Sequence, residues 1–300
     1  KESIRKNSVY RYKKHLIIGI GGDSGSGKSF FSKDFENLSG KNNLLFLESD
    51  SDHKWERGSL KWKVFTHLNP QANRLHNQFE MLKVLKDGKK VAKRDYNHST
   101  GKFTKLHEVE PKKFIFLCGL HPYYLPKTRK IIDLKIYMNP DEKIRKKWKL
   151  SRDSKLRSQK RQKIFDELVR RESDRKKHII PQMQFADLIF SYKLKANKGI
   201  DENNLKLKVL LDADVTLDLV LEDIAKIKSL KFKYDFSDDL KKQKIEFNGR
   251  ISSSEIKKIA VEYVDNLYEL IPENTKFFSN YRGLRQLLTL LMINNFLKEN

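Results

Sequence analysis

The residues that most directly suggest chemistry lie at positions 22–29, which read Gly-Asp-Ser-Gly-Ser-Gly-Lys-Ser. They fit the pattern G-x-x-x-x-G-K-[ST], in which glycines let backbone N–H groups converge on phosphate oxygens and the following helix N-terminus adds partial positive charge. In such a loop Lys28 reaches the β and γ phosphates of a nucleoside triphosphate, and the Ser29 hydroxyl binds Mg²⁺. A plain surface loop can have the same composition, but the apolar segments on both sides favour phosphate binding. The residues expected to contact the nucleotide are Gly22, Asp23, Ser24, Gly25, Ser26, Gly27, Lys28, Ser29 and Phe30.

A second polar cluster follows the short apolar run 43–47 and reads Glu48-Ser49-Asp50-Ser51-Asp52-His53. Open α/β sheets place their ligand sites at the carboxyl ends of strands, so these side chains are expected to lie near the phosphate-binding loop. A carboxylate at that place can orient a hydroxyl group in line with a γ-phosphoryl group.

The elements that must position these residues alternate between strand and helix. Short apolar runs at 16–20, 43–47, 113–119, 131–138 and 186–190 predict buried strands. Patterns after residue 28 and at 70–85, 141–153 and 161–172 predict helices. Strands that alternate with helices form a parallel sheet. We therefore expect an α/β fold of the P-loop NTPase type, with a doubly wound, mostly parallel sheet flanked by helices.

Residues 196–204 resemble a linker, and the part beyond them is expected to form a C-terminal α/β extension. Strands are predicted near 231–236 and 244–248 and helices at 217–228 and 282–297, and a capping box at 252–255 predicts the start of one more helix. This last third has no cluster of chemical groups and is interpreted as scaffold or oligomer contact. We expect a single domain over residues 1–300, with a core at about 13–194 and the extension at about 205–300.

Composition excludes several classes of protein. The hydrophobic fraction of 38% is ordinary for a globular chain, and the longest apolar run, 287–293, is too short to cross a membrane. The single cysteine, Cys118, cannot form an internal disulfide, and residues 1–14 are polar and basic without the apolar region of a secretory signal. These features predict a cytoplasmic protein.

The formal net charge of +24 is spread over the whole sequence and is densest at 143–163. Nucleic-acid-binding surfaces usually interleave aromatic residues with such charge, and this stretch has only Trp148. Phosphate handling is therefore the better interpretation, and a nucleic-acid partner is not expected.

Several further motifs carry a resemblance to a known family. They are Asp50-Ser51-Asp52-His53 with Glu56-Arg57, Leu68-Asn69-Pro70-Gln71-Ala72-Asn73, Tyr96-Asn97-His98-Ser99-Thr100-Gly101, Gly119-Leu120-His121-Pro122, Trp148-Lys149 through Arg152-Asp153, and Pro181-Gln182 followed by Ala186-Asp187. With the loop, they make residues 16–191 resemble the phosphoribulokinase/uridine kinase family of P-loop kinases, and within it the phosphoribulokinases most. Residues 283–289 weakly resemble the end of that family. Ordered motifs at matching separations are more specific than any one motif.

The resemblance implies a role for each matching residue. It implies that Asp50 is the general base for the acceptor hydroxyl, that Lys28, Arg152 and Asp153 complete the catalytic set, and that Ser29 and Asp50 bind Mg²⁺. The residues that it implies for acceptor binding are His53, Arg57, Tyr96, His98, His121, Lys149 and Arg157. Arginine suits this task because it can grip a phosphate bidentately. Taken singly, Arg152 and Asp153 could be a surface ion pair and His53 a polar core residue.

The sequence also departs from the family. The family carries a glutamate near Mg²⁺ where this chain has Cys118, and a thiol is a poor ligand for a hard cation. The carboxylate must then come from Glu48, Asp50 or Asp52, or turnover is impaired. Phe30 replaces the usual hydroxyl residue after the loop serine, and Arg157 is followed by serine where the family often has glycine. The loop has no cysteine, so the thiol-based light regulation of photosynthetic family members has no partner here.

Together these features predict an ATP- and Mg²⁺-dependent kinase that phosphorylates a hydroxyl of a small sugar phosphate, with ribulose 5-phosphate as the expected acceptor. One alternative is a uridine- or cytidine-type nucleoside kinase, against which His53 and Arg57 argue because a nucleoside brings no phosphate to bind. The other is an ATP-binding paralogue with weak or no catalysis in a regulatory or nucleic-acid-associated role, suggested by Cys118 and the charge. By resemblance we also expect a homo-oligomer, in particular a dimer, without membrane association.

Overall fold

The structure, a computed structural model, describes residues 15–157, 160–194 and 205–299. One eight-stranded sheet runs through it in the order β11-β12-β10-β9-β8-β1-β7-β2. The N-terminal strands pair in parallel. They are β1 (Leu16–Gly22), β2 (Leu44–Glu48), β7 (Phe114–Cys118), β8 (Leu134–Met138) and β9 (Leu188–Leu194). The expected doubly wound, mostly parallel sheet is therefore confirmed.

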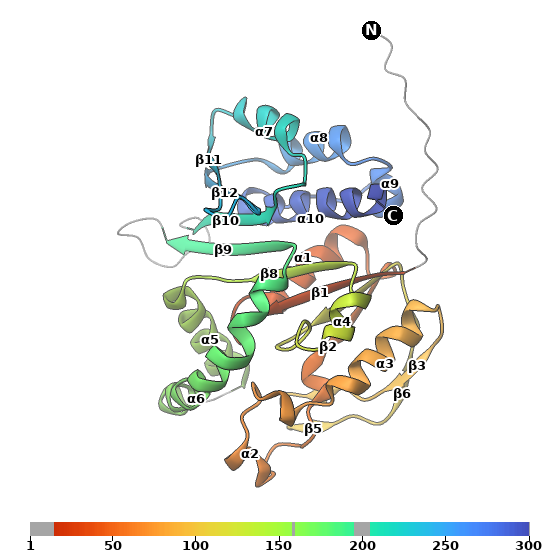
Figure 1. The fold of residues 1–300 in the computed structure, drawn as a ribbon, viewed down its shortest axis with the longest axis vertical. Coiled ribbons are helices and arrows are strands. Elements are labelled where there is room, and N and C mark those ends of the chain that lie inside the picture. The colour runs from red at the N-terminus through yellow and green to blue at the C-terminus, as the bar shows by residue number, and fades with distance from the viewer. Residues whose placement is uncertain (1–14, 158–159, 195–204, 300) are drawn as a thin grey trace.

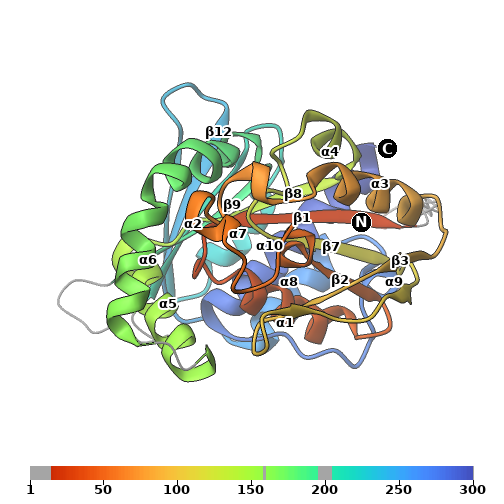
Figure 2. The same cartoon turned by 90° about the horizontal axis from the view of Figure 1, so that it is seen from below.

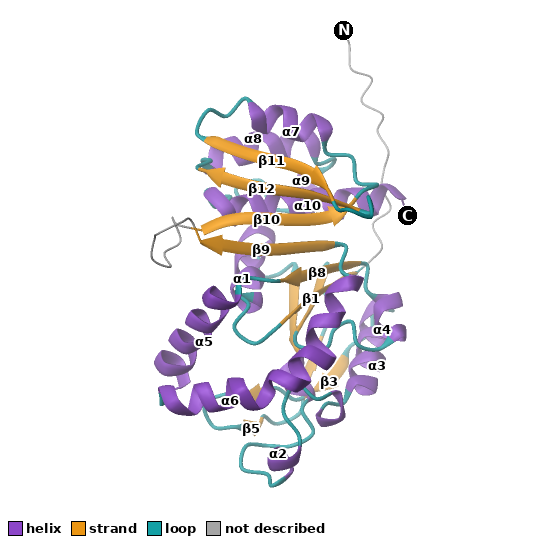
Figure 3. Cartoon of the chain, turned by 60° about the vertical axis from the view of Figure 1, so that its left-hand side comes forward, coloured by secondary structure: helices purple, strands orange, loops and turns teal. Residues whose placement is uncertain are grey.

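The C-terminal strands continue the same sheet in antiparallel pairing (Figure 3). They are β10 (Leu205–Asp212), β11 (Leu230–Phe236) and β12 (Lys242–Gly249). Along β10, buried and half-buried residues alternate, because helices cover only one face of this part of the sheet. The expected linker at 196–204 lies outside the described residues.

Helices cover both faces of the parallel part, which explains why every residue of β1 is buried. On one face, α1 (Lys28–Ser39) packs against α10 (Asn280–Glu299), which in turn contacts α8 (Ser253–Tyr263) (Figures 1 and 2). On the other face, α3 (Leu75–Lys86) packs against α4 (Pro126–Ile131). Alternate residues of β1 therefore enter two different core clusters.

Helices α5 (Glu142–Arg157) and α6 (Arg161–Asp174) extend away from the sheet on one side of the molecule (Figure 1). Small elements lie between β2 and β7 in the chain, and sequence periodicity predicts none of them. They are α2 (Lys61–Val64), the paired strands β3 (Val91–Lys93) and β6 (His107–Val109), and the hairpin of β4 (Tyr96–Asn97) and β5 (Lys102–Phe103). The remaining short elements are η1 (Ser49–Asp52), η2 (Pro70–Ala72), η3 (Arg175–Ile179), η4 (Ile180–Phe185), α7 (Asp218–Ala225) and α9 (Leu267–Leu270).

The predicted helix at 70–85 is interrupted at its start. The segment η2 ends at Ala72, and Asn73 has an extended backbone because its side-chain amide donates to the carbonyls of His67 and Asn69. Helix α3 therefore begins only at Leu75. The capping box is confirmed, since the hydroxyl of Ser252 accepts from the N–H of Glu255 at the start of α8.

The predicted strand at 131–138 also begins later, at Leu134. Ile131 belongs to α4, and the carboxylate of Asp133 accepts the N–H of Ile17 in β1. Within the described ranges, no helix is long and apolar enough to span a membrane.

Candidate active site

The loop between β1 and α1 has the curled backbone that the sequence predicts. Gly25 and Gly27 have φ angles of 84° and 90°, in the left-handed region that favours glycine. The ammonium of Lys28 folds back over the loop and donates to the carbonyls of Gly22 and Asp23, each at 2.8 Å. Burial lowers the pKa of Lys28. The N–H groups of the first turn of α1 have no partner within the helix and can bind an anion in front of the loop.

Helix α5 lies directly against this loop. A Cβ atom on Gly25 would lie 2.7 Å from Cβ of Lys149, so only glycine allows the approach. Arg145 donates to the carbonyl of Ser24 and pairs with Asp23 at 2.8 Å. Asp23 also pairs with Arg175, so its carboxylate holds the helices to the loop and does not face a nucleotide.

The basic residues of α5 are organised by one buried acid. Asp153 accepts from Nζ of Lys149 at 2.7 Å and from Nε of Arg152 at 2.8 Å. Burial opposes ionisation of Asp153, but the hydrogen bond and charge of Arg152 and the charge of Lys149 lower its pKa to about 2. Arg152 also donates to the hydroxyl of Ser24 at 3.2 Å. Arg152 is thus fixed at the loop, while Lys149 is 2% exposed and committed to Asp153.

A cavity of about 490 Å³ opens beside the loop, and its walls combine the loop with aromatic residues. Trp148 and Tyr281 both pack edge-on against Tyr192, with ring centroids 5.5 Å away. Aromatic walls next to a phosphate-binding loop can accept a planar base. The lining residues are Gly25, Ser26, Gly27, Lys28, Ser29, Phe30, Trp148, Ser151, Arg152, Leu205, Tyr281 and Arg285.

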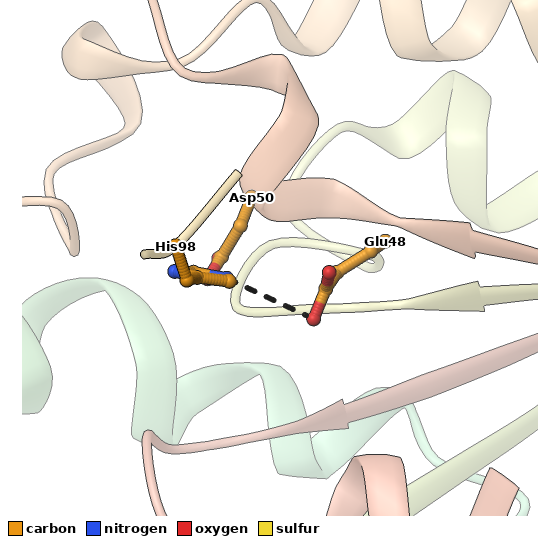
Figure 4. Close-up of side chains that lie close together, drawn as sticks. All are labelled: Glu48, Asp50 and His98. Carbon is orange, nitrogen blue, oxygen red and sulfur yellow. Dashed lines mark ion pairs between the residues drawn. The ribbon is translucent and has the colours of Figure 1, made fainter. Parts of the chain in front are cut away.

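The carboxylates of Glu48, the last residue of β2, and of Asp50 converge with the imidazole of His98 (Figure 4). Nε2 of His98 lies 3.3 Å from Oδ2 of Asp50 and 4.0 Å from Oε1 of Glu48. Burial alone would raise the pKa of Asp50, but the contact with His98 and the charges of the neighbouring histidines outweigh it and hold this pKa well below its usual range. Asp50 is therefore ionised at neutral pH and can accept a proton or bind a cation.

Cys118 ends β7 beside this cluster, in register with Glu48 on β2. It is 3% exposed, and burial raises the pKa of its thiol to about 12, so the sulfur is protonated and unsuited to a hard cation. Among the carboxylates that could replace the family's glutamate, Glu48 and Asp50 form a group with His98 that could hold a metal ion. Asp52 turns away and accepts from Nε2 of Gln78 at 2.7 Å.

Asp50 lines a second cavity, of about 230 Å³. His53 lines it and is held by Nδ1, which contacts Oδ1 of Asn73 at 2.8 Å, while its Nε2 lies 3.8 Å from Asp50. Tyr96 packs edge-on against both His53 and His98. The lining residues are Ser24, Asp50, His53, Arg57, Gly58, Trp62, His67, Tyr96, His98, Leu120, Arg152, Lys163, Glu167, Arg170 and Arg171.

Arg57 reaches this cavity but is engaged with the hairpin of β4 and β5. Its guanidinium donates to the carbonyls of His98 at 2.5 Å and Ser99 at 3.1 Å. Its stem packs where a side chain on Gly101 would stand, so glycine is required at that turn. Arg57 thereby fixes the loop that carries His98.

Among the residues expected at the acceptor, His121 and Lys149 do not line this cavity. His121 is buried, its Nε2 donates to the carbonyl of Leu68 at 2.8 Å, and burial lowers its pKa to about 4. The side chain of Arg157 lies outside the described residues.

The structure adds residues that the sequence did not single out. Lys163, Glu167, Arg170 and Arg171 of α6 line the second cavity, and Leu205, Tyr281 and Arg285 of the C-terminal extension line the first. The only sequence signal for the α6 group is its spacing, which places these positions on one face of a helix. Nothing local in the sequence connects residues 205, 281 and 285 to residue 28.

Comparisons with known proteins agree with these features. The model of the phosphoribulokinase/uridine kinase family matches residues 17–197. A phosphoribulokinase of Synechocystis is 34% identical over 174 residues, which are 58% of this chain and 52% of that protein. A uridine kinase of Ligilactobacillus salivarius is 32% identical over 162 residues, 52% of this chain and 75% of that protein. This chain spans about half the length of the phosphoribulokinases that it matches.

Among solved structures, phosphoribulokinase from Rhodobacter spheroides matches with a TM-score of 0.64 and 18% identity, covering 96% of this chain and 99% of that chain. At this identity the likeness shows the fold. The family match extends from β1 through β9, the part of the chain that carries both the phosphate-binding loop and the carboxylates after β2. The expected resemblance is confirmed, and the chain belongs to the phosphoribulokinase/uridine kinase family.

Proposed function

We propose that this protein is an ATP-dependent kinase that transfers the γ-phosphoryl group to a hydroxyl of a sugar phosphate, with ribulose 5-phosphate as the acceptor. The observation that carries this proposal is the relation of the two cavities. Arg152 lines both of them, and Asp50 lines the second beside the loop residue Ser24. A phosphoryl group transferred in line between two cavities needs a cation at their junction and a proton acceptor on the acceptor side.

In the donor cavity, the loop holds the phosphates of ATP and the aromatic walls hold its base. Lys28 exchanges its contacts with the carbonyls of Gly22 and Asp23 for the β and γ phosphates. Trp148 and Tyr281 supply the rings against which the adenine packs.

Mg²⁺ fits the oxygen donors present here. The hydroxyl of Ser29 at the start of α1 and the carboxylates of Asp50 and Glu48 would hold it. When bound, the ion neutralises charge on the transferring phosphoryl group. Glu48 pairs in register with Cys118 on the neighbouring strand, so its carboxylate lies next to the position at which the family has its glutamate.

In the acceptor cavity, Asp50 orients the hydroxyl and takes its proton, because its low pKa keeps it ionised. His53 and Tyr96 line the sugar site. Lys149 and Asp153 act by fixing Arg152 in position, since both are buried and bonded to one another.

From the family we further propose a homodimer in the cytoplasm. Light scattering after gel filtration would test the oligomeric state, and localisation of a tagged chain would test the compartment.

The deciding experiment measures ADP release with ATP, Mg²⁺ and a panel of pentose phosphates, pentoses and nucleosides. We expect turnover that requires a phosphorylated pentose and that falls by at least about a hundredfold in Asp50→Asn, because general base catalysis contributes about that much. Lack of acceptor-dependent ADP with every compound would refute the kinase proposal. Turnover with uridine or cytidine alone would assign the protein to the nucleoside kinases instead. Salt-dependent binding to random DNA would favour a nucleic-acid-associated paralogue.

A further inference from the structure

We propose that helix α6 forms the phosphate-binding end of the acceptor cavity, with Arg171 as the central phosphate ligand, Arg170 and Lys163 as flanking cations, and Glu167 as the anion that limits its affinity. This inference rests on the proposed function, because it states how the phosphate of the acceptor is held. Neither the motifs nor the family resemblance assigns a role to these residues.

The four residues form one stripe along α6. Positions 163, 167, 170 and 171 recur at helical spacing, and all four line the cavity that contains Asp50. The stripe carries three cations and one anion, so it adds net positive charge to the cavity that also contains Asp50. An acceptor with both a phosphate and a hydroxyl needs a cationic ligand and a carboxylate in one cavity, and this lining offers both.

Arg171 is the residue of this stripe that is built for a ligand. Its side chain is 14% exposed, and its Nη2 forms an ion pair with Oε2 of Glu167 at 3.0 Å. Its Nε is fully buried and has no hydrogen-bond partner among the described residues. A buried N–H without an acceptor costs free energy, which a phosphate oxygen in the cavity would recover.

Arg171 also lies within electrostatic reach of the reacting groups. Burial lowers the pKa of its guanidinium. The negative charge of Glu167 opposes this shift most, and the charges of Asp153 and Asp50 oppose it to a smaller extent. Arg170, which also lines the cavity, donates to the carbonyl of Trp62 in α2 at 2.9 Å. The stripe is therefore within electrostatic reach of the reacting groups and is also bonded to α2.

The arginine that the family resemblance implies for this phosphate is engaged elsewhere. Arg57 donates to the carbonyls of His98 and Ser99, so part of its guanidinium holds the hairpin that positions His98 beside Asp50. Nε of Arg171, by contrast, is buried and has no hydrogen-bond partner among the described residues. A nucleoside would leave this donor unpaired, which discriminates against acceptors without a phosphate.

The test uses direct binding, so it does not depend on which sugar is the acceptor. Protein saturated with ADP, which fills the loop, is titrated with inorganic phosphate and with ribulose 5-phosphate in a calorimeter. Arg171→Met is expected to weaken both ligands by about tenfold or more, the range for a charge-assisted hydrogen bond. Glu167→Gln is expected to tighten both by about threefold or more, because it removes an anion from the cavity. The control Arg161→Gln changes a cation of the same helix that is exposed and does not line the cavity, and it should leave both affinities unchanged.

Tighter binding in Glu167→Gln cannot arise from damage to the fold, so this variant keeps the test decisive if Arg171→Met is unstable. An unchanged or weakened affinity in Glu167→Gln would overturn the proposal. So would an equal loss of affinity for ribulose without its phosphate in Arg171→Met. If no sugar phosphate supports turnover but inorganic phosphate follows the expected pattern, the proposed reaction fails while the phosphate subsite stands.

Discussion

The buried ion pairs between α1 and α10 give the most quantitative prediction. Asp34 of α1 is 2% exposed and accepts from Nη2 of Arg285 at 2.7 Å and from Nε and Nη2 of Arg282 at 3.0 and 2.6 Å. Arg285 is 1% exposed and also donates to the hydroxyl of Tyr192 at 2.6 Å. One carboxylate of the core thus neutralises two arginines of the C-terminal helix.

Replacing Asp34 by leucine leaves the guanidinium of Arg285 buried without a counter-charge. Breaking a buried pair in this way costs about 3–5 kcal/mol, whereas replacing both partners by apolar residues is often nearly neutral. We therefore expect Asp34→Leu to lose about 3–5 kcal/mol of unfolding free energy and Asp34→Leu with Arg285→Met to recover most of it. Arg282, which is 24% exposed at its side chain, can be solvated in either variant.

The assay is urea unfolding followed by tryptophan fluorescence and circular dichroism, with Trp148 reporting locally because it packs against Tyr192. The control is Lys298→Met, which removes an exposed pair between α10 and Asp265 and should cost less than about 1 kcal/mol. A loss below about 1 kcal/mol in Asp34→Leu, or a double variant no more stable than the single one, would refute this reasoning.

Three further predictions concern the site. Gly25→Ala would place a side chain at a φ of 84° and a Cβ atom 2.7 Å from Cβ of Lys149. Affinity for a fluorescent ATP analogue should therefore fall by about tenfold or more. An unchanged affinity would contradict the packing of α5 on the loop. Glu48→Gln should weaken Mn²⁺ binding to the ADP complex by about tenfold, measured by electron paramagnetic resonance, whereas Cys118→Glu should change this binding little. A larger effect of Cys118→Glu than of Glu48→Gln would show that Glu48 does not supply the carboxylate. Burial raises the pKa of Asp52 from 3.8 to about 7, so between these values the folded state binds more protons than the unfolded state. Asp52 therefore destabilises the fold increasingly as the pH rises from about 4 to 7. Asp52→Asn should therefore increase the free energy of unfolding by up to about 4 kcal/mol at pH 8 but not at pH 4, measured from urea unfolding midpoints without metal. An equal difference at both pH values would contradict the raised pKa of Asp52.

The sequence predicts well those features that one strand end or one turn determines. The phosphate-binding loop depends on glycines at positive φ and on the helix that starts at Lys28, and both are local properties. The position of Asp50 follows from its place after a buried strand. The parallel order of the first strands follows from their alternation with helices.

Features that depend on distant contacts could not be derived in this way. His121 belongs to a motif of the family, yet it bonds to the carbonyl of Leu68 and does not line the acceptor cavity. Lys149 looks like a free cation in the sequence, but a single turn of helix places it on Asp153. In both cases the residue type and spacing fit the expected chemistry, and the partner that engages the side chain decides its availability.

The C-terminal extension is the opposite case, because its sequence gives no sign of the part that it takes in the site. Its sequence has no chemical cluster and by itself indicates scaffold or oligomer contact. In the structure, Leu205 and Tyr281 form walls of the cavity beside the phosphate-binding loop, and Arg285 of α10 lines that cavity while pairing with Asp34 of α1, the helix that starts at the loop. The extension therefore both completes the donor cavity and fixes the helix whose N-terminus faces the phosphates. It follows that a variant such as Asp34→Leu should weaken nucleotide binding as well as stability, because loosening α10 removes a wall of the donor cavity and the support of α1 together.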